Sequence, residues 1–315
     1  MDILLSSISQ GLIWSIMAIG VYLTFRILDI ADMTAEGAFP LGAAFAASLI
    51  ANHANPWLAT LVGMLGGMAA GLVSGLLYTR LRIPALLTGI LTLTGLYSIN
   101  LRIMGKANIA LLNQTTVFSA FARFSNTTQV IIVGALLVAV IMILLVLFFN
   151  TEMGLAARAV GDNPDMSAAN GVHVANMQIV IYMLSNGLIA LAGALMAQSN
   201  GYADISMGVG TIVIALAAII IGEVLVRNLT FGKRLLTIII GAIIYRLIIA
   251  LVLWLGVDPN DLRLFYAGLL TVLLALPWVR NRVKTSTRRR LNRQHIATLN
   301  AQDNGEEKEH ADNDK

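Results

Sequence analysis

The sequence predicts an all-α membrane protein, a polytopic bundle of about eight to ten transmembrane helices. Hydrophobic residues make up 57% of the 315 residues and charged residues only 12%, and the mean hydropathy is +0.79. A soluble domain carries roughly 25% charged residues. The run 127–150 contains no charged residue at all, and about 20 apolar residues suffice to cross the hydrocarbon core. Because no water is available there, the backbone must satisfy its own hydrogen bonds, and such runs are helices.

Nine apolar segments define the predicted membrane domain, which covers residues 1–279. They lie at 3–25, 37–52, 57–79, 83–104, 129–149, 178–198, 211–226, 234–255 and 262–279. A tail follows at 280–315. Seven of the fourteen residues from Arg280 to Arg293 are Lys or Arg, which is typical of a cytoplasmic flank lying against anionic membrane lipid. The remainder, from Asp303 onward, is acidic and polar, as in disordered segments.

Basic residues also suggest which side of the membrane each loop occupies. The excess of Lys and Arg in cytoplasmic loops places the tail and the segment 150–177 in the cytoplasm. An odd number of spans would then leave the N-terminus outside. Residues 26–42 interrupt the hydrophobic pattern and are expected to form a broken or re-entrant helix, so the first two spans are the least regular.

Several kinds of chemistry are excluded by missing residues. The chain has no cysteine, which excludes disulfides and thiol catalysis. It lacks the G-x-x-x-x-G-K-[ST] loop that cradles nucleotide phosphates, so it should not itself hydrolyse ATP. It has no H-E-x-x-H motif, and its four histidines are scattered without the spacing of metal ligands. We therefore expect no metal, no cofactor and no enzymatic activity. The basic tail accounts for the high isoelectric point, so no nucleic-acid partner is expected.

Two patterns of small residues concern helix packing. Gly63, Gly67, Gly71 and Gly75 recur at every fourth position of one span, which lets two helix backbones approach closely. Packing inside the chain is the simpler interpretation, and the seam of a homodimer is the alternative. The segments 28–47 and 202–218 each place an Asp-Ile, a Met and glycines before a small-residue helix. Transporters often pair such interrupted segments between repeats, with the substrate path at their junction.

The segment 150–177 is polar and alanine-rich between two predicted spans. Asp162 or Asn163 can cap a helix, Pro164 suits its first position, and Gly171 suits the left-handed residue that ends it. These residues predict a short helix from Pro164 to Asn170. A helix of two turns is marginal alone in water, so we expect it to dock onto a partner. An ordinary interfacial loop helix is the alternative.

The run GLAARAVGDNPDMSAANGV at 154–172 resembles the coupling loop of permeases from ABC importers, in the branch that serves branched-chain amino acids and ribose. The resemblance extends from about residue 8 to residue 279. The runs TIVIALAAIIIGE at 211–223 and IIYRLIIALVLWLGVDPNDLRLF at 243–265 are similar to a subgroup associated with aromatic amino-acid uptake. The broader family usually carries a second glycine where this chain has Glu223.

The resemblance implies a permease in a bacterial cytoplasmic membrane, acting by alternating access. Its expected partners are a cytoplasmic ABC ATPase, an external solute-binding protein and a second, identical permease subunit. The coupling loop would sit in a cleft of the ATPase and transmit its closure to the spans. The residues that it assigns to this coupling are Arg158, Gly161, Asp162, Asn163, Pro164, Met166, Ala168, Ala169 and Gly171.

Charged residues within the spans are candidates for the substrate pathway. Arg246 and Glu223 lie inside apolar segments, where a charge facing lipid costs roughly 2.5–3.5 kcal/mol. Both should face the bundle interior or a water-filled cavity. Arg246 could neutralise a substrate carboxylate, but a structural ion pair with Glu223 or Glu36 is the preferred interpretation.

The polar residues Asp32, Thr34 and Glu36 could line the pathway or form an interfacial turn. Tyr97 and Asn100 are weaker pathway candidates, for which a role in the core is the alternative. A different class of function remains open. A secondary transporter driven by an ion gradient would use Glu36, Asp32 or Glu223 as its ion site and would need no ATPase.

Overall fold

The computed structural model describes residues 2–121, 123–226, 230–258, 261, 262, 264, 265, 267–272 and 275. The chain divides into Met1–Ala267 and Gly268–Lys315, and every element discussed below belongs to the first unit. The tail predicted at 280–315 and much of the segment predicted at 262–279 lie outside the described residues.

Long apolar helices dominate the described part of the chain, and the all-α prediction is confirmed. Six helices are long and apolar enough to cross a membrane. They are α1 (Asp2–Tyr22, continued by a π-helix at Leu23–Ile27), α3 (Pro56–Thr79), α4 (Ala85–Met104), α5 (Asn126–Phe149), α8 (Val174–Asn200) and α10 (Phe231–Trp254). Two shorter apolar helices, α2 (Ala35–Ala51) and α9 (Thr211–Leu225), complete the set.

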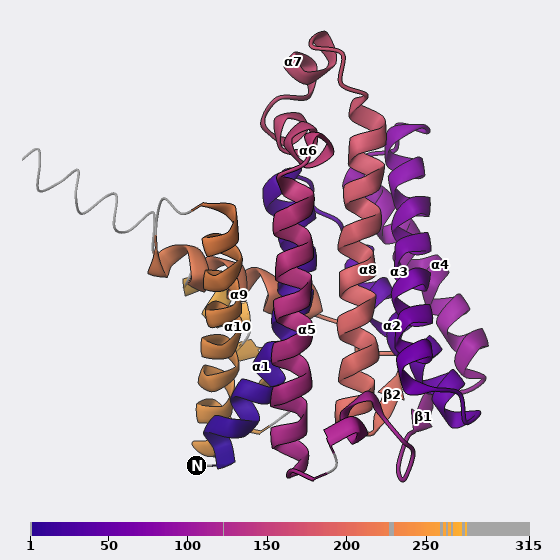
Figure 1. Cartoon of the computed structure of the whole chain (residues 1–315), viewed down its shortest axis with the longest axis vertical. Helices are drawn as coiled ribbons and strands as arrows, with labels where there is room; N and C mark the ends of the chain where they lie inside the picture. The colour runs from indigo at the N-terminus through magenta and orange to yellow at the C-terminus, as the bar shows by residue number, and fades with distance from the viewer. Residues whose placement is uncertain are drawn as a thin grey trace, which may run out of the picture. The chain divides into compact units, whose positions relative to one another are not determined.

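Smaller elements mark the two ends of the helix bundle (Figure 1). At one end lie α6 (Glu152–Asp162) and α7 (Pro164–Ala169), between α5 and α8. At the other end the strands β1 (Asn108–Ala110) and β2 (Tyr202–Asp204) pair antiparallel. A 3-10 helix at Val117–Phe121 lies at this second end, where the Val117 N–H donates to the side-chain oxygen of Gln198 near the end of α8. We refer to these as the α6–α7 end and the β1–β2 end.

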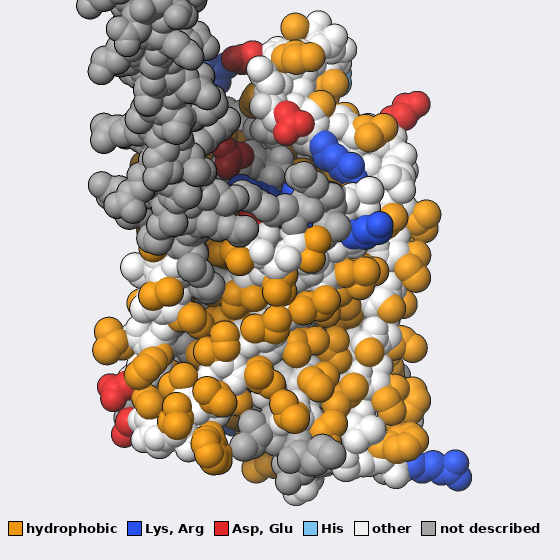
Figure 2. Space-filling model, turned by 90° about the vertical axis from the view of Figure 1, so that its left-hand side faces the viewer, with side chains coloured by type: hydrophobic (Ala, Val, Ile, Leu, Met, Phe, Trp, Pro, Cys, Tyr) orange, Lys and Arg blue, Asp and Glu red, His pale blue; other side chains and the backbone are white. Residues whose placement is uncertain are grey.

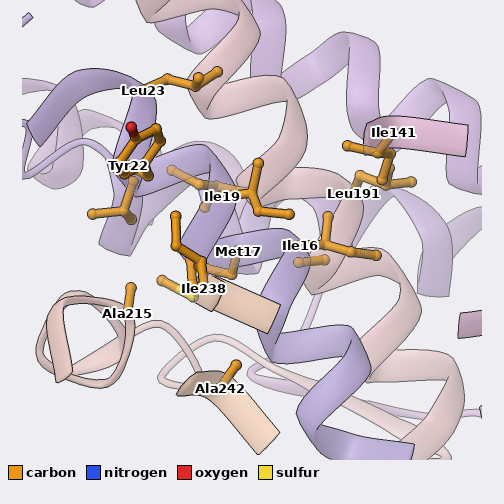
Figure 3. Close-up of a cluster of buried hydrophobic side chains, with 14 of the residues drawn as sticks. Ile16, Met17, Ile19, Tyr22, Leu23, Ile141, Leu191, Ala215, Ile238 and Ala242 are labelled. Carbon is orange, nitrogen blue, oxygen red and sulfur yellow. The ribbon is translucent and has the colours of Figure 1, made fainter. Parts of the chain in front are cut away.

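The helix α1 lies in the centre of the bundle. Its side chains Ile16, Met17 and Ile19 are completely buried. Figure 3 shows them among side chains from four other helices, with Ile141 from α5 and Ile238 from α10. A helix that is apolar on every side and buried by neighbours is expected at the core of a membrane bundle.

The glycine stripe of α3 faces α8. A Cβ atom on Gly71 would lie 2.3 Å from the Tyr182 carbonyl oxygen, and one on Gly67 would lie 2.4 Å from that of Asn186. Only glycine allows backbones to approach this closely. Packing inside the chain is therefore confirmed, and the alternative of a homodimer seam along this stripe is wrong.

The outer surface of the bundle is apolar. Large exposed hydrophobic side chains recur on α5 at Leu136, Val140, Ile143, Leu144 and Leu147, on one helical face. Figure 2 shows a broad field of hydrophobic side chains on another side of the molecule, with charged side chains at its upper and lower margins. An apolar surface of this extent, bounded by charge at both ends, fits a membrane-embedded protein.

Two broken-helix units meet inside the bundle. α1 and α8 are each followed by an irregular segment, at 28–34 and 201–210, and then by a short helix, α2 or α9. The starts of α2 and α9 touch, since the Gly210 N–H donates to Glu36 Oε1 at 3.0 Å. This arrangement accompanies the internal echo seen in the sequence. The contact between residues 35–40 of α2 and residues 205–210 is called the broken-helix junction below.

Candidate functional site

The segment 150–177 contains two helices, of which the sequence predicted one. The first, α6, is capped by Thr151, whose hydroxyl accepts a hydrogen bond from the Gly154 N–H at 3.3 Å. Its buried residues Gly154, Ala157 and Val160 lie on one face and pack toward the bundle. The signal that was overlooked is this threonine cap, followed by an acidic residue in the first turn.

The second helix, α7, begins at Pro164 as predicted and ends at Ala169, one residue before the predicted end. The side chain of Asn163, not that of Asp162, accepts from the Met166 N–H at 2.9 Å, and Pro164 occupies the first turn. Gly171, two residues after the end of the helix, has a φ of +84°. The Val172 N–H then donates to the Ser167 carbonyl at 3.0 Å, which closes the turn.

One face of α7 is unoccupied in this unit. Ser167 is buried, whereas Met166 is 65% exposed, and Pro164, Ala168 and Ala169 are also exposed. An exposed methionine between small residues suits contact with a partner surface, because the side chain is flexible and apolar. Asp162 and Asn163 are exposed as well.

Two of the predicted coupling residues point into the bundle instead. A Cβ on Gly161 would lie 1.6 Å from the Ile27 carbonyl oxygen, so α6 is packed directly on the π-helix that ends α1. The Arg158 guanidinium lies 4.6 Å from the ring centroid of Phe231 and 5.2 Å from that of Phe149. These contacts join α6 to α1, α5 and α10. A displacement of α7 that moves α6 would therefore be transmitted to all three helices.

A buried polar network surrounds the segment before α2. Asp32 Oδ1 accepts from the Thr34 N–H at 2.9 Å, and Oδ2 accepts from Asn186 Nδ2 at 2.8 Å. The Thr34 hydroxyl lies 2.8 Å from that of Ser74, which donates to Thr92. This network fixes the irregular segment 28–34 against α3, α4 and α8.

Glu36 and Asn100 lie at the broken-helix junction. Glu36 is half-buried and accepts from the Gly210 N–H at the start of α9. A Cβ on Gly208 would lie 2.0 Å from the Glu36 carbonyl oxygen, so glycine is required there. Asn100 is buried and donates to the Gly37 carbonyl at 3.3 Å, while its own side-chain oxygen is buried without a partner among the described residues.

The expected pair between Arg246 and Glu223 is wrong. Glu223 accepts two hydrogen bonds from Arg26, with Nε–Oε1 at 2.7 Å and Nη2–Oε2 at 3.0 Å. The reason is geometric. α9 and α10 run antiparallel with Gly222 opposite Thr237, and Arg246 lies nine residues further along α10, about 14 Å at the rise of an α-helix. Arg246 is half-buried in the second half of α10.

The predicted pathway residues thus fall into separate places. Asp32, Thr34, Glu36 and Asn100 surround the start of α2. Glu223 lies at the far end of α9, and Tyr97 is 55% exposed on the surface of α4. The sequence analysis missed Asn186, Ser74 and Arg26 as partners of these residues. The Ser185-Asn186 pair inside an apolar run was the available signal, since polar residues within spans usually have a function or a partner.

Comparison with known proteins identifies the family. Residues 3–275 match the family described as "Branched-chain amino acid transport system / permease component". The chain belongs to this permease family. The match covers most of the chain and both halves of the broken-helix junction, so this is a multi-pass membrane protein of the type found in ABC importers, and a transporter component rather than an enzyme.

Individual relatives are similar over most of the chain. The chain is 43% identical over 272 residues to the tyrosine transport system permease protein of Clostridioides difficile, an alignment covering 86% of this chain and 90% of that protein. It is 32% identical over 279 residues to the uncharacterized protein RP368 of Rickettsia prowazekii, covering 87% and 98%. It is 27% identical over 243 residues to the ribose import permease protein RbsC of Bacillus subtilis, covering 76% and 74%. No solved structure matches the chain.

Proposed function

We propose that this permease is the membrane-spanning subunit of an ABC importer that moves an amino acid inward across a bacterial cytoplasmic membrane. A separate cytoplasmic subunit hydrolyses the ATP. The observation that carries the proposal is the exposed face of α7, held in place by defined caps at both ends. A cytoplasmic location of the tail at 280–315 is part of the proposal, because Lys and Arg are enriched at 280–293.

Coupling follows from the way α6 is mounted. The ATPase receives Pro164, Met166, Ala168 and Ala169 of α7, and its closure displaces the α6–α7 pair. Because Gly161 lies directly on the Ile27 carbonyl, α6 cannot move without pushing on the end of α1. Packed helices transmit such displacements as rigid bodies, and α1 contacts both α8 and α10 in the core.

The solute path runs beside the broken-helix junction. Helix N-termini carry partial positive charge and favour anionic groups such as an amino-acid carboxylate, and the starts of α2 and α9 meet at this point. Asp32, Thr34 and Asn100 support the junction. Glu36 links its two halves, while Tyr97 and Arg246 remain candidates for contact with the solute. A second, identical permease subunit completes the path, and an external binding protein delivers the solute.

The solute is proposed to be an aromatic amino acid. The support is the 43% identical relative, which is named as a tyrosine transport system permease. More distant relatives are named for ribose and fructose, so membership of the family alone does not define the solute.

Reconstitution tests both parts of the proposal. The chain is purified with a candidate ABC ATPase and placed in liposomes with a candidate solute-binding protein. Uptake of labelled tyrosine, tryptophan, leucine and ribose is then measured. ATP-dependent uptake of tyrosine or tryptophan, with little leucine or ribose, is expected. ATP-dependent uptake of ribose alone would overturn the solute class. Uptake by the chain without any ATPase, driven by a proton or sodium gradient, would overturn the importer assignment.

A further inference from the structure

A cavity at the α6–α7 end is lined by three arginines. It has a volume of about 240 Å³ and lies between the end of α1, α6 and the start of α10, and its lining residues are Tyr22, Arg26, Ile27, Arg158, Asp162, Phe231 and Arg234. Its size is below the roughly 300–1,000 Å³ of pockets for drug-sized ligands. The cavity therefore suits a small charged group.

The charges around the cavity do not cancel. Arg26 is paired with Glu223, and Asp162 is the carboxylate among the lining residues. Among the described residues, three guanidinium groups and these two carboxylates leave one positive charge. Within the described residues, no carboxylate forms an ion pair with Arg158 or Arg234. A singly charged anion would balance this set.

Arg158 is held in a fixed orientation inside this cluster. Its guanidinium lies over the rings of Phe149 and Phe231. Its Nε and Nη2 atoms are buried and have no acceptor among the described residues. Arginine supplies several N–H donors in a planar fork that matches phosphate oxygens. Because these two atoms are buried, an anion in the cavity would balance the charge of the guanidinium without accepting from Nε or Nη2.

The location favours a phosphate group. The cavity lies at the end of the spans α1 and α10, beside a segment expected to face the cytoplasm, which is the depth of lipid headgroups. Basic pockets between transmembrane helices on the cytoplasmic side bind anionic phosphate headgroups. A phosphodiester carries a single negative charge, which matches the net charge of the cluster.

We infer that the cavity between α1, α6 and α10 is a phosphate-binding site, in which Arg158 and Arg234 bind the phosphate of an anionic phospholipid or free inorganic phosphate. The site is separate from the broken-helix junction and from the exposed face of α7. The inference does not depend on the identity of the transported solute or on an ATPase partner. A bound anion would stabilise the packing of α6 against α1 and α10, because residues of all three helices line the cavity.

The test is binding by the purified chain in detergent, measured by native mass spectrometry. Short-chain phosphatidylglycerol and phosphatidylcholine are titrated separately, and inorganic phosphate is added alone and as a competitor. The parent chain is compared with Arg234→Gln, with Arg234→Lys and with Lys233→Gln. Lys233 is the neighbouring exposed residue of α10 and does not line the cavity, so Lys233→Gln removes the same charge outside the site.

We expect phosphatidylglycerol to bind the parent and Lys233→Gln more tightly than phosphatidylcholine does. Arg234→Gln should bind phosphatidylglycerol about tenfold more weakly than the parent, which corresponds to about 1.4 kcal/mol. The affinity of Arg234→Lys should lie between those of the parent and Arg234→Gln. Binding of phosphatidylglycerol without competition by phosphate identifies the lipid as the source, and binding of phosphate alone identifies the free anion. Equal weakening of phosphatidylglycerol binding by Arg234→Gln and Lys233→Gln would overturn the site. So would a parent chain that binds phosphatidylglycerol no more tightly than phosphatidylcholine and does not bind inorganic phosphate.

Discussion

Glycine is required at Gly161 and at Gly171 for two different physical reasons. At Gly161 the obstacle is contact, because an added Cβ would lie 1.6 Å from the Ile27 carbonyl oxygen. At Gly171 nothing lies within 4 Å of the Cβ position, but φ is +84°, a left-handed conformation that costs other residues roughly 1–2 kcal/mol. The same substitution should therefore act differently at the two sites.

Asparagine distinguishes the two cases, since it tolerates the left-handed region better than most residues. Gly171→Asn should be closer to the parent in thermal stability than Gly171→Ala. At Gly161 the order should reverse, with Gly161→Ala destabilising by about 1–3 kcal/mol through overpacking and Gly161→Asn by more. Thermal unfolding of the purified variants in detergent measures this. The same order of Ala and Asn at both positions would contradict the explanation.

The sequence showed which ionisable residues are unusual but not how they are paired. Glu223 and Arg246 stood out because charges are rare inside apolar runs. Their pairing depends on the antiparallel register of α9 and α10, and on the proximity of Arg26 from the first span. Neither the register of these helices nor the proximity of Arg26 can be predicted from a short stretch of sequence. The caps of α7, by contrast, lie within ten residues of one another and could be read directly.

At the scale of elements, the packing of α3 against α8 can be tested with a single substitution. Gly71→Ala places a Cβ 2.3 Å from the Tyr182 carbonyl oxygen, which neither backbone can easily accommodate. We expect a loss of about 1–3 kcal/mol in the free energy of unfolding. Gly95→Ala on α4 is the matched control, since its added Cβ meets nothing within 4 Å.

Gly95→Ala should leave stability unchanged or slightly increased, because alanine is a better helix former. Chemical unfolding of both variants in mixed micelles gives the comparison. A stable Gly71→Ala protein would show that α3 and α8 are not in backbone contact.

The elements themselves were predicted to different degrees. The long spans follow from hydropathy, which needs no tertiary information. α6 was missed because its signals, the Thr151 cap and the buried positions Gly154, Ala157 and Val160, were overlooked beside the stronger caps around Pro164. The predicted segments 37–52 and 211–226 agree within two residues with α2 and α9. The contact between Glu36 and Gly210, 174 residues apart, could not be predicted from local sequence.

The contact between Glu36 and Gly210 also separates the two classes of transporter. If Glu36 joins the two halves of the junction, Glu36→Gln should retain uptake, because its side-chain carbonyl can still accept from the Gly210 N–H. Glu36→Ala removes the acceptor and should lower uptake several-fold, because losing one hydrogen bond costs about 1 kcal/mol. An ion-coupled carrier would behave differently, since a glutamine cannot exchange a proton at neutral pH. Initial rates of uptake in vesicles provide the measurement. Complete loss of uptake with Glu36→Gln would favour the ion-coupled mechanism.

At the scale of the whole molecule, we propose that α7 is the surface through which ATP hydrolysis drives the membrane bundle. Ala169→Glu puts a charge on the exposed face of α7, and Ala120→Glu makes the same change at an exposed residue of the β1–β2 end. Both variants should insert and purify normally.

The decisive measurement is the stimulation of ATPase activity by solute-loaded binding protein in liposomes containing each variant. We predict that Ala169→Glu loses the stimulation and the stable association with the ATPase, whereas Ala120→Glu retains both. Full stimulation and normal association with Ala169→Glu would contradict the account, because α7 would then be a passive connection between α6 and α8.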